Sequence, residues 1–556
     1  MKLEDLSREE LIALIKKYEA KKKYGLVWED EKTRENFESK SSLFIPLLSE
    51  VKKQRIVSDP KLKPNYLIEG DNYFALSILR YSHFESIDFI YIDPPYNTGN
   101  KDFKYNDIFV DKEDTFRHSK WLDFMNKRLR IAKDLLTREG VIFVSIGDDE
   151  LANLKLLMDS IFGESNFVEL FVWNKTQTPP SLSKKSRSNV EYILCYERNR
   201  NSKRYFGKPS SNSDAPLINK GNSKRILKFP AKSIAFKIQD GLYKPKKLQG
   251  IKILKQFKVS GGFNVDEVEL EAEFKWTQEN LNEELTKGTT LIVKSNKFSI
   301  RYKKPDSSVA DMVPNKLIDS NFGVGTNEEG SSLLINMGFS FSFPKPVSLI
   351  KFLINMITHD NKEAKVLDFF AGSGTTGHAV LELNKEDSGN RSFILVTNNE
   401  ENICTEITYP RLKKVIEGYK NSKGESVETL GGNLSFFKTK FLRKSLSNDE
   451  MKIMVTENCV DLLCFKEGIF DEVFSNDSFT VFKNENYILG IYFSYDNSEL
   501  KHLKKELNKF TKIQKKAYIF TFDKAGLNSN DFLDWDGISV EPIPQKILDV
   551  LGGLYA

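Results

Sequence analysis

The sequence predicts an α/β fold in which two blocks of chain share one sheet and a smaller α/β unit follows. Short β-type runs alternate with amphipathic helical runs in two stretches, a polar basic segment separates these stretches, and an unusual loop follows a strand-like run in each. With 556 residues, of which 40% are hydrophobic, the chain is long enough for more than one core.

The elements of the two blocks follow from their apolar patterns. In the first block we expect strands at 87–92 (IDFIYI) and 141–146 (VIFVSI), helices at 120–136 and 150–162, and further apolar runs at 167–173 and 191–196. In the second we expect helices at 346–357 and 375–383 and strands at 365–370 and 392–397. A third unit begins near Gly431, with strands at 487–493 and 517–522 around a charged helix at 499–510.

These patterns divide the chain into five segments. Residues 1–44 form an N-terminal helical extension, in which Ser7 and Glu10 make a capping box. Residues 45–173 and 336–425 are the two halves of one sheet domain, residues 174–335 are an insert, and residues 426–556 form a small C-terminal α/β domain.

The insert carries the charge of the protein. Between residues 174 and 258 there are 21 Lys and Arg against four acids, a net charge of +17, whereas the whole chain has +5 and the remainder therefore −12. A local basic region is what nucleic acid requires, although a charge run is also typical of a solvated face. The acidic stretch that follows, residues 266–284, predicts a separate surface.

Several protein classes are excluded. The N-terminal MKLEDLSREEL lacks a signal-peptide pattern, and no uninterrupted apolar run approaches 18 residues, so we expect a cytoplasmic protein without a membrane segment. The four cysteines show no CxxC spacing and have no neighbouring His, which argues against a disulfide framework and against a metal site.

The first distinctive loop is rich in glycine. The strand 366-VLDFF-370 runs into 371-AGSGTTGHAV-380, so that Gly372, Gly374 and Gly377 stand at a strand-to-helix turn. Such a turn lets a ligand approach the backbone, and the helix N-terminus favours a cofactor with an anionic or carboxylate group. His378 and Ala379 stand where a nucleoside-triphosphatase loop has Lys and then Ser or Thr, which argues against ATP hydrolysis.

The second loop, 93-DPPYNTG-99, which we name the acceptor loop, directly follows the strand-like run 87–92. Two prolines fix the backbone and leave carbonyl acceptors, Asp93 adds a carboxylate, and Tyr96 adds an aromatic ring. An exocyclic amino group on a nucleobase needs both acceptors and a stacking surface. The alternative is a rigid Asp-Pro turn without chemistry.

Together the motifs DPPY (93–96) and DFFAGSGT (368–375) resemble those of the S-adenosylmethionine-dependent amino methyltransferases of DNA. Their order, with the acceptor loop first, then a basic insert, then the glycine loop, is similar to the permuted β group, whose insert is a target-recognition domain. With IEGDNYFAL (68–76), FPKP (343–346) and GGNLSFFKT (431–439), the chain resembles the modification subunit of a type III restriction-modification system over about residues 60–440. The fold implied is a Rossmann-like methyltransferase sheet.

The resemblance implies roles for individual residues. Asp93 and the carbonyl of Pro94, held by Pro95, would accept the two N–H bonds of the target amine, and Tyr96 would stack on the extruded base. Asp71 and Asn72 would face the adenine end of S-adenosylmethionine, Asn97 and Thr98 its carboxylate or ribose, and Glu400 the ribose hydroxyls. The methionine end would be lined by Asp368, Phe370, Ala371, Gly372 and Gly374, and Lys345 and Thr375 complete the cofactor set. No metal is needed.

The base, the polymer and the partners stay open at this point. Asp93 favours N6 of adenine over N4 of cytosine, whose enzymes more often have Ser at this position. A 5-methylcytosine enzyme needs a nucleophilic cysteine, normally after a proline, and is disfavoured because no Pro precedes any of the four cysteines. The glycine loop is also compatible with a hydride-transfer enzyme, but such an enzyme would explain neither the acceptor loop nor the basic insert. RNA, or a non-catalytic nucleic-acid-binding role, remains as an alternative. We expect double-stranded DNA as the substrate, a homodimer, and a helicase-nuclease restriction subunit docking on residues 431–556, which could equally be a stabilising cap.

Overall fold

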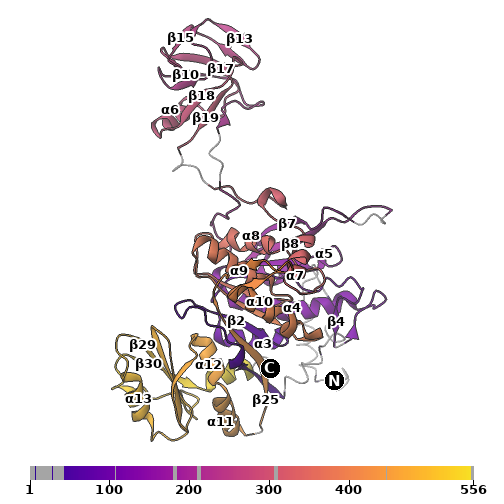
Figure 1. Ribbon diagram of the computed structural model, residues 1–556, viewed down its shortest axis with the longest axis vertical. Coiled ribbons are helices and arrows are strands. Elements are labelled where there is room, and N and C mark those ends of the chain that lie inside the picture. The colour runs from indigo at the N-terminus through magenta and orange to yellow at the C-terminus, as the bar shows by residue number, and fades with distance from the viewer. Residues whose placement is uncertain are drawn as a thin grey trace. The chain divides into compact units, whose positions relative to one another are not determined.

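The structure is a computed structural model that describes Ser7, Trp28, Glu35 and residues 43–106, 108–179, 184–209, 214–305, 311–445 and 447–552. The expected N-terminal helix and its capping box, apart from Ser7, lie outside these residues. The chain divides into two compact units, each described here by itself (Figure 1). The sheet unit comprises Met1–Tyr205 and Asn315–Ala556, and the insert unit comprises Phe206–Pro314.

A ten-stranded sheet forms the centre of the sheet unit. In spatial order its strands are β1 (Phe44–Glu50), β25 (Asn433–Arg443), β2 (Pro64–Glu69), β22 (Ser392–Thr397), β21 (Lys365–Asp368), β3 (Ile87–Ile92), β6 (Leu136–Ile146), β8 (Val190–Glu197), β7 (Phe167–Asn174) and β20 (Leu317–Ile318). The six strands from β25 to β6 run parallel, while β1 and β8 are antiparallel to their neighbours. The α/β fold predicted from the sequence is confirmed.

Helices cover both faces of this sheet, as continuous apolar strands require. Ile90 and Ile92 of β3 pack on one side, in a core shared with α3 (Asn72–Ser82), α4 (Arg117–Leu135) and α5 (Leu151–Phe162). Phe89 and Tyr91 pack on the other, in a core shared with α8 (Val347–Thr358), α9 (Thr375–Asp387) and α10 (Tyr409–Glu417). Successive residues of one strand therefore serve two cores. The sheet unit also contains α7 (Asn327–Asn336) and the hairpins β4 (Lys104–Tyr105) with β5 (Ile108–Phe109) and β23 (Tyr419–Lys420) with β24 (Ser426–Val427).

Strands β21 and β3 are parallel neighbours, with Val366 opposite Phe89. The glycine loop follows β21 and the DPPY loop follows β3, so both leave the sheet at the same edge. This is the edge at which ligands bind in open α/β folds.

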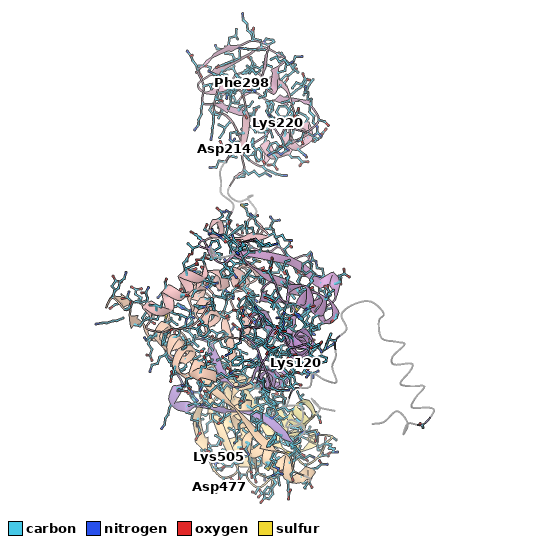
Figure 2. All side chains as sticks on the ribbon, turned by 90° about the vertical axis from the view of Figure 1, so that its right-hand side faces the viewer. Lys120, Asp214, Lys220, Phe298, Asp477 and Lys505 are labelled. Atoms are coloured by element: carbon cyan, nitrogen blue, oxygen red, sulfur yellow. The ribbon has the colours of Figure 1, made fainter. Side chains whose placement is uncertain are left out.

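The insert unit consists of two small sheets around a core of its own. One sheet has the order β10 (Arg225–Phe229), β17 (Val268–Ala272), β14 (Ile251–Ile253), β13 (Lys246–Leu248). The other has the order β12 (Gly241–Tyr243), β15 (Phe257–Ser260), β16 (Phe263–Asn264), β11 (Ile234–Phe236), β18 (Thr290–Val293), β19 (Ile300–Lys303), β9 (Ala215–Pro216), and α6 spans Gln278–Thr286. Phe298 is buried in this core, and Lys220 and Asp214 lie on the same unit (Figure 2).

The insert unit differs from the sequence expectation in two ways. It is narrower than residues 174–335, because β8 and β20 pair with strands of the central sheet. The acidic stretch does not form a separate surface: β17 lies between the basic strands β10 and β14, and its Glu269 and Glu271 pair with Lys228 at 3.6 Å and Lys252 at 3.8 Å. The expectation was wrong because a strand's neighbours depend on pairing that charge counts do not report.

The C-terminal segment packs on the central sheet. A five-stranded sheet has the order β26 (Asp471–Ser475), β27 (Phe479–Lys483), β28 (Tyr487–Tyr492), β29 (Gln514–Phe520), β30 (Ile538–Ile543), and four helices accompany it: α11 (Asn448–Asn458), α12 (Val460–Glu467), α13 (Leu500–Asn508) and α14 (Gln545–Gly552). Phe465 of α12 and Leu551 of α14 share a core with Leu79 of α3. Residues 433–443, which we assigned to the C-terminal domain, are strand β25 of the central sheet. Within the described residues, none of the helices has the length and apolar character needed to span a membrane.

Candidate functional site

A cavity of about 930 Å³ opens at the edge of the sheet where the two distinctive loops leave it. This is within the size range of ligand and cofactor sites in proteins. Of the residues singled out in the sequence, the following line it: Asp71, Asn72, Asp93, Pro94, Pro95, Phe370, Gly372 and Glu400. The cavity therefore brings together segments more than 270 residues apart in the chain.

The glycine loop is shaped by backbone conformations that favour glycine. Gly372 has φ +49° and Gly374 has φ +80°, both in the left-handed region, and α9 begins immediately after Gly374. Asp368 holds this loop from beneath. Its carboxylate is 2% exposed and accepts hydrogen bonds from the Phe370 amide at 2.9 Å and the Thr376 hydroxyl at 2.5 Å.

Burial gives Asp368 an unusual protonation behaviour. Burial raises its pKa from 3.8 to about 7, although the two hydrogen bonds oppose the shift. Because the folded protein binds a proton that the unfolded chain releases, the free energy of unfolding should fall as the pH rises from about 4 to about 7, by at most about 1.4 kcal/mol per pH unit.

We expect Asp368→Asn to remove this contribution. Urea titrations at several pH values should show the wild type losing stability relative to the variant as the pH rises through this window, and a constant difference between the two proteins would contradict the assignment. His502→Gln, at a half-exposed histidine of α13, serves as the control and should leave the Asp368 contribution in place.

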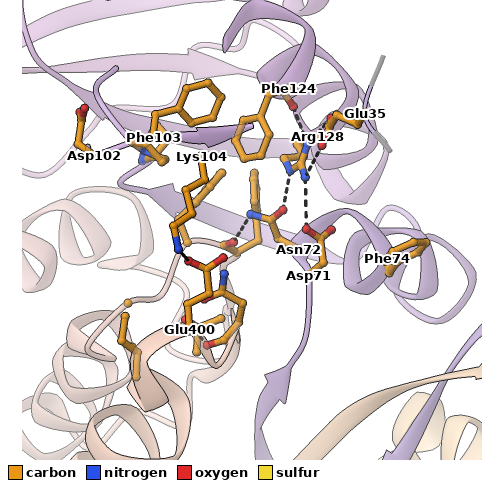
Figure 3. A pocket seen from close by; sticks show the side chains of 18 of the residues that line it. Glu35, Asp71, Asn72, Phe74, Asp102, Phe103, Lys104, Phe124, Arg128 and Glu400 are labelled. Carbon is orange, nitrogen blue, oxygen red and sulfur yellow. Dashed lines mark hydrogen bonds and ion pairs between the residues drawn. The ribbon is translucent and has the colours of Figure 1, made fainter. Parts of the chain in front are cut away.

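Arg128 connects the residues at the far end of the cavity (Figure 3). Its guanidinium is fully buried, donates to the Asn72 amide oxygen at 2.5 Å, lies 3.6 Å from Asp71, and donates to Glu35 at 3.0 and 3.3 Å. It also stacks on the Phe124 ring at 3.6 Å from the centroid. Sequence reasoning missed Arg128, although an arginine in the apolar stripe of an amphipathic helix was a signal that could have found it.

The segment that follows β22 also lines the cavity. Glu400 lines the cavity and accepts from Lys104 Nζ at 2.7 Å, so that an ion pair crosses the cavity from the β4–β5 hairpin (Figure 3). Of the two asparagines before it, Asn398 lines the cavity, whereas Asn399 accepts from the Thr405 amide. This strand end therefore places two acids at the cavity, Glu400 and Glu401, and Glu400 is the one paired with Lys104.

The acceptor loop is held by a buried network of charges. Asp93 accepts from Lys345 Nζ at 2.8 Å and from the Tyr96 hydroxyl at 3.0 Å. Lys345 is also 3.3 Å from Glu191, and Lys175 donates to Glu191 at 3.2 Å. Lys345, expected at the cofactor, thus faces Asp93 instead. Sequence reasoning missed Glu191, an acid within the apolar strand run EYILCY.

The remaining predicted residues lie outside the cavity lining. The Asn97 side chain is fully buried and donates to Glu150 at 2.5 Å and to the Arg117 carbonyl at 3.3 Å. The Thr98 amide donates to Asp102 at 2.9 Å. The others that do not line the cavity are Tyr96, Lys345, Asp368, Ala371, Gly374 and Thr375. Among the described residues there is also no cluster of three His, Cys, Asp or Glu side chains that could hold a metal ion.

A mostly parallel sheet in which adjacent strands carry a glycine loop and an acceptor loop around one cavity defines the methyltransferase class of α/β proteins. The chain belongs to the DNA methylase family, which it matches over residues 87–409, more than half of its length.

Two known relatives are each 30% identical to the chain over the residues that match. It is 30% identical over 389 residues to the type III restriction-modification enzyme StyLTI Mod subunit of Salmonella typhimurium, covering 61% of this chain and 53% of that protein. It is 30% identical over 357 residues to the type II methyltransferase M.KpnI of Klebsiella pneumoniae, covering 61% and 82%. The chain spans about half the length of the Mod subunit. Among solved structures, the PvuII DNA methyltransferase (cytosine-N4-specific) is similar at 14% identity and a TM-score of 0.32, covering 64% of this chain and 94% of that one.

Proposed function

We propose that this protein transfers a methyl group from S-adenosylmethionine to the N6 amine of adenine in duplex DNA, within a restriction-modification system. The observation that carries the proposal is the single cavity lined by both Asp93 and Gly372. The family match and the names of the relatives, which include Mod subunits of type III enzymes, support it. Action on DNA agrees with the cytoplasmic location expected from the sequence.

The residues present fit the cofactor. S-adenosylmethionine supplies the methyl group at a positively charged sulfonium. Asp71, Asn72 and Glu400 offer acceptors for the amine of its adenine and the hydroxyls of its ribose, and Gly372 lets the cofactor approach the backbone of the glycine loop. Phe370 also lines the cavity and adds an aromatic ring to its wall.

At the acceptor loop, Asp93 and the Pro94 carbonyl accept the two N–H bonds of the target amine. This turns the nitrogen lone pair toward the methyl group, and the rate gain comes from positioning and from acceptors placed where positive charge develops. The amine is paired in the duplex, so the base must leave the helix at a cost of a few kcal/mol, which contacts in the cavity offset.

The base and the polymer are tested together. Tritiated S-adenosylmethionine is incubated with the protein and duplex DNA, single-stranded DNA or RNA, and the product is digested and separated as nucleosides. Labelled N6-methyl-2′-deoxyadenosine from duplex DNA is the expected result. Label in N4-methylcytosine would support the alternative amine, and the absence of label from every polymer would support a non-catalytic binding protein.

We further propose that the basic insert binds the DNA backbone. The insert unit contains 20 Lys and Arg against 12 acids, a net charge of +8. Each phosphate contact contributes about 0.9 to the slope of log affinity against log salt. With about six such contacts, we expect duplex affinity to fall about 10³-fold between ~50 and ~200 mM salt. Fluorescence anisotropy measures this, and an affinity that does not change with salt would show that the basic side chains are only a solvated face.

We also propose a homodimer, in which the insert of one subunit reads the DNA while the cavity of the other receives the base. The molar mass in solution, from light scattering, tests it.

The relatives named as Mod subunits support a restriction subunit as a partner, for which the C-terminal sheet β26–β30 is the proposed docking site.

A further inference from the structure

Glu191 is a buried carboxylate beside the acceptor loop, and none of the sequence motifs includes it. It lies on β8 opposite Trp173 of β7 and is 7% exposed. Its Oε2 atom is 3.0 Å from the Tyr96 hydroxyl and 3.3 Å from Lys345 Nζ. Because the same hydroxyl and the same ammonium also contact Asp93, the two carboxylates share both partners.

One hydroxyl proton serves two carboxylate contacts in this group of buried side chains. The Tyr96 hydroxyl is 3.0 Å from Asp93 Oδ1 and 3.0 Å from Glu191 Oε2, but it has a single proton to donate. While both carboxylates are ionised, only one of these contacts can be a hydrogen bond. If Asp93 takes up a proton, it donates to the Tyr96 oxygen, Tyr96 donates to Glu191, and both contacts become hydrogen bonds.

Methyl transfer releases one proton at this position, so the inference rests on the proposed function. The bond between the amine nitrogen and the methyl carbon forms while the sulfur–methyl bond breaks, and the sulfur keeps the electron pair. The positive charge passes from sulfur to nitrogen. The nitrogen then loses an N–H proton to Asp93 and keeps the bonding electrons, so the total charge of the site does not change.

Lys345 and Glu191 act on Asp93 with opposite signs. Burial raises the pKa of Asp93, the charge of Lys345 lowers it, and the charge of Glu191 raises it, with a raised pKa as the result. The other titratable groups around the two carboxylates are Tyr91, Tyr96, Lys175 and Asp368. Without Glu191, the ammonium of Lys345 would leave Asp93 a poorer proton acceptor.

We propose that Glu191 is a positioning residue that keeps Asp93 able to accept the proton released by the methylated amine. It does so by offsetting the charge of Lys345 and by accepting the hydrogen bond of the Tyr96 hydroxyl. The proposal holds for adenine and cytosine alike, because both amines release this proton.

The experiment measures single-turnover methyl transfer to duplex DNA between about pH 5 and about pH 9. Glu191→Gln should lower the plateau rate about 10-fold or more and move the acid limb of the profile to lower pH, because the charge that raises the Asp93 pKa is gone. Lys345→Met should move the acid limb to higher pH. Glu191→Asp, which retains the charge, should restore most of the rate.

Glu197→Gln is the matched control. Glu197 is a buried acid of the same strand, 3% exposed, and it accepts from the Tyr205 hydroxyl and the Asn201 amide, away from the acceptor loop. Its profile should match that of the wild type. Thermal melting and cofactor binding establish that each variant is folded.

An acid limb that Glu191→Gln leaves in place, whatever the plateau rate, overturns the proposal. If Glu191→Gln does not fold, an unmoved limb in Lys345→Met overturns it. A wild-type protein without any methyl transfer would instead refute the proposed function.

Discussion

Asp93→Ala should lower single-turnover methyl transfer by about 10³-fold or more while cofactor affinity changes only a few-fold. The acceptor stabilises positive charge on the amine during the reaction, and loss of such a group affects the chemical step rather than ground-state binding. Asp93→Asn should be similarly inactive, because an amide keeps the size but loses the charge that receives the proton. Rapid-quench transfer of tritiated methyl groups gives the rate, and calorimetry gives the cofactor affinity.

The control for this prediction is Asp477→Ala, at an exposed aspartate between β26 and β27 of the C-terminal sheet (Figure 2). It should match the wild type in rate and in cofactor affinity. An Asp93→Ala protein that still transfers methyl groups at more than about a tenth of the wild-type rate would remove the acceptor loop from the mechanism.

Most of the sheet could be predicted from the sequence because its central strands are short, continuous apolar runs. Such runs can be recognised without knowing which strands they pair with. The run IDFIYI became β3, and KVLD became β21, with the glycine and acceptor loops where the parallel pairing requires them. The edges were less predictable. Strand β25 ends in a polar half that resembles a linker, and its place between β1 and β2 depends on pairing across more than 360 residues.

The site residues divide in the same way. Asp93, Gly372 and Glu400 could be predicted because they belong to loops whose chemistry is local. Lys345 could be assigned to the site but not to a partner, since its contact with Asp93 joins residues 252 positions apart. Glu191 and Arg128 carry no motif, and only their burial among apolar neighbours distinguishes them from surface charges.

Arg128→Met should destabilise the protein by about 3–5 kcal/mol, the cost of leaving one partner of a buried ion pair alone. Glu35 would stay buried at 7% exposure with its main cation gone, and its pKa, already raised by burial despite the opposing charge of Arg128, would rise further. The loss of stability should therefore be smaller at low pH, where Glu35 is protonated. Cofactor affinity should fall about 10-fold or more, because Asn72 and Asp71 lose the group that orients them.

Two further variants separate the buried pair from the packing of the helix. Arg130→Met changes an exposed arginine two positions along α4, which contacts Asn126, and should alter the free energy of unfolding by about 0.5 kcal/mol or less. Adding Glu35→Gln to Arg128→Met removes the uncompensated charge and should recover part of the lost stability, but not the cofactor affinity, which depends on Asn72 and Asp71. Urea unfolding and calorimetry measure the two effects. Equal losses from Arg128→Met and Arg130→Met would mean that the buried guanidinium is not what holds this end of the cavity together.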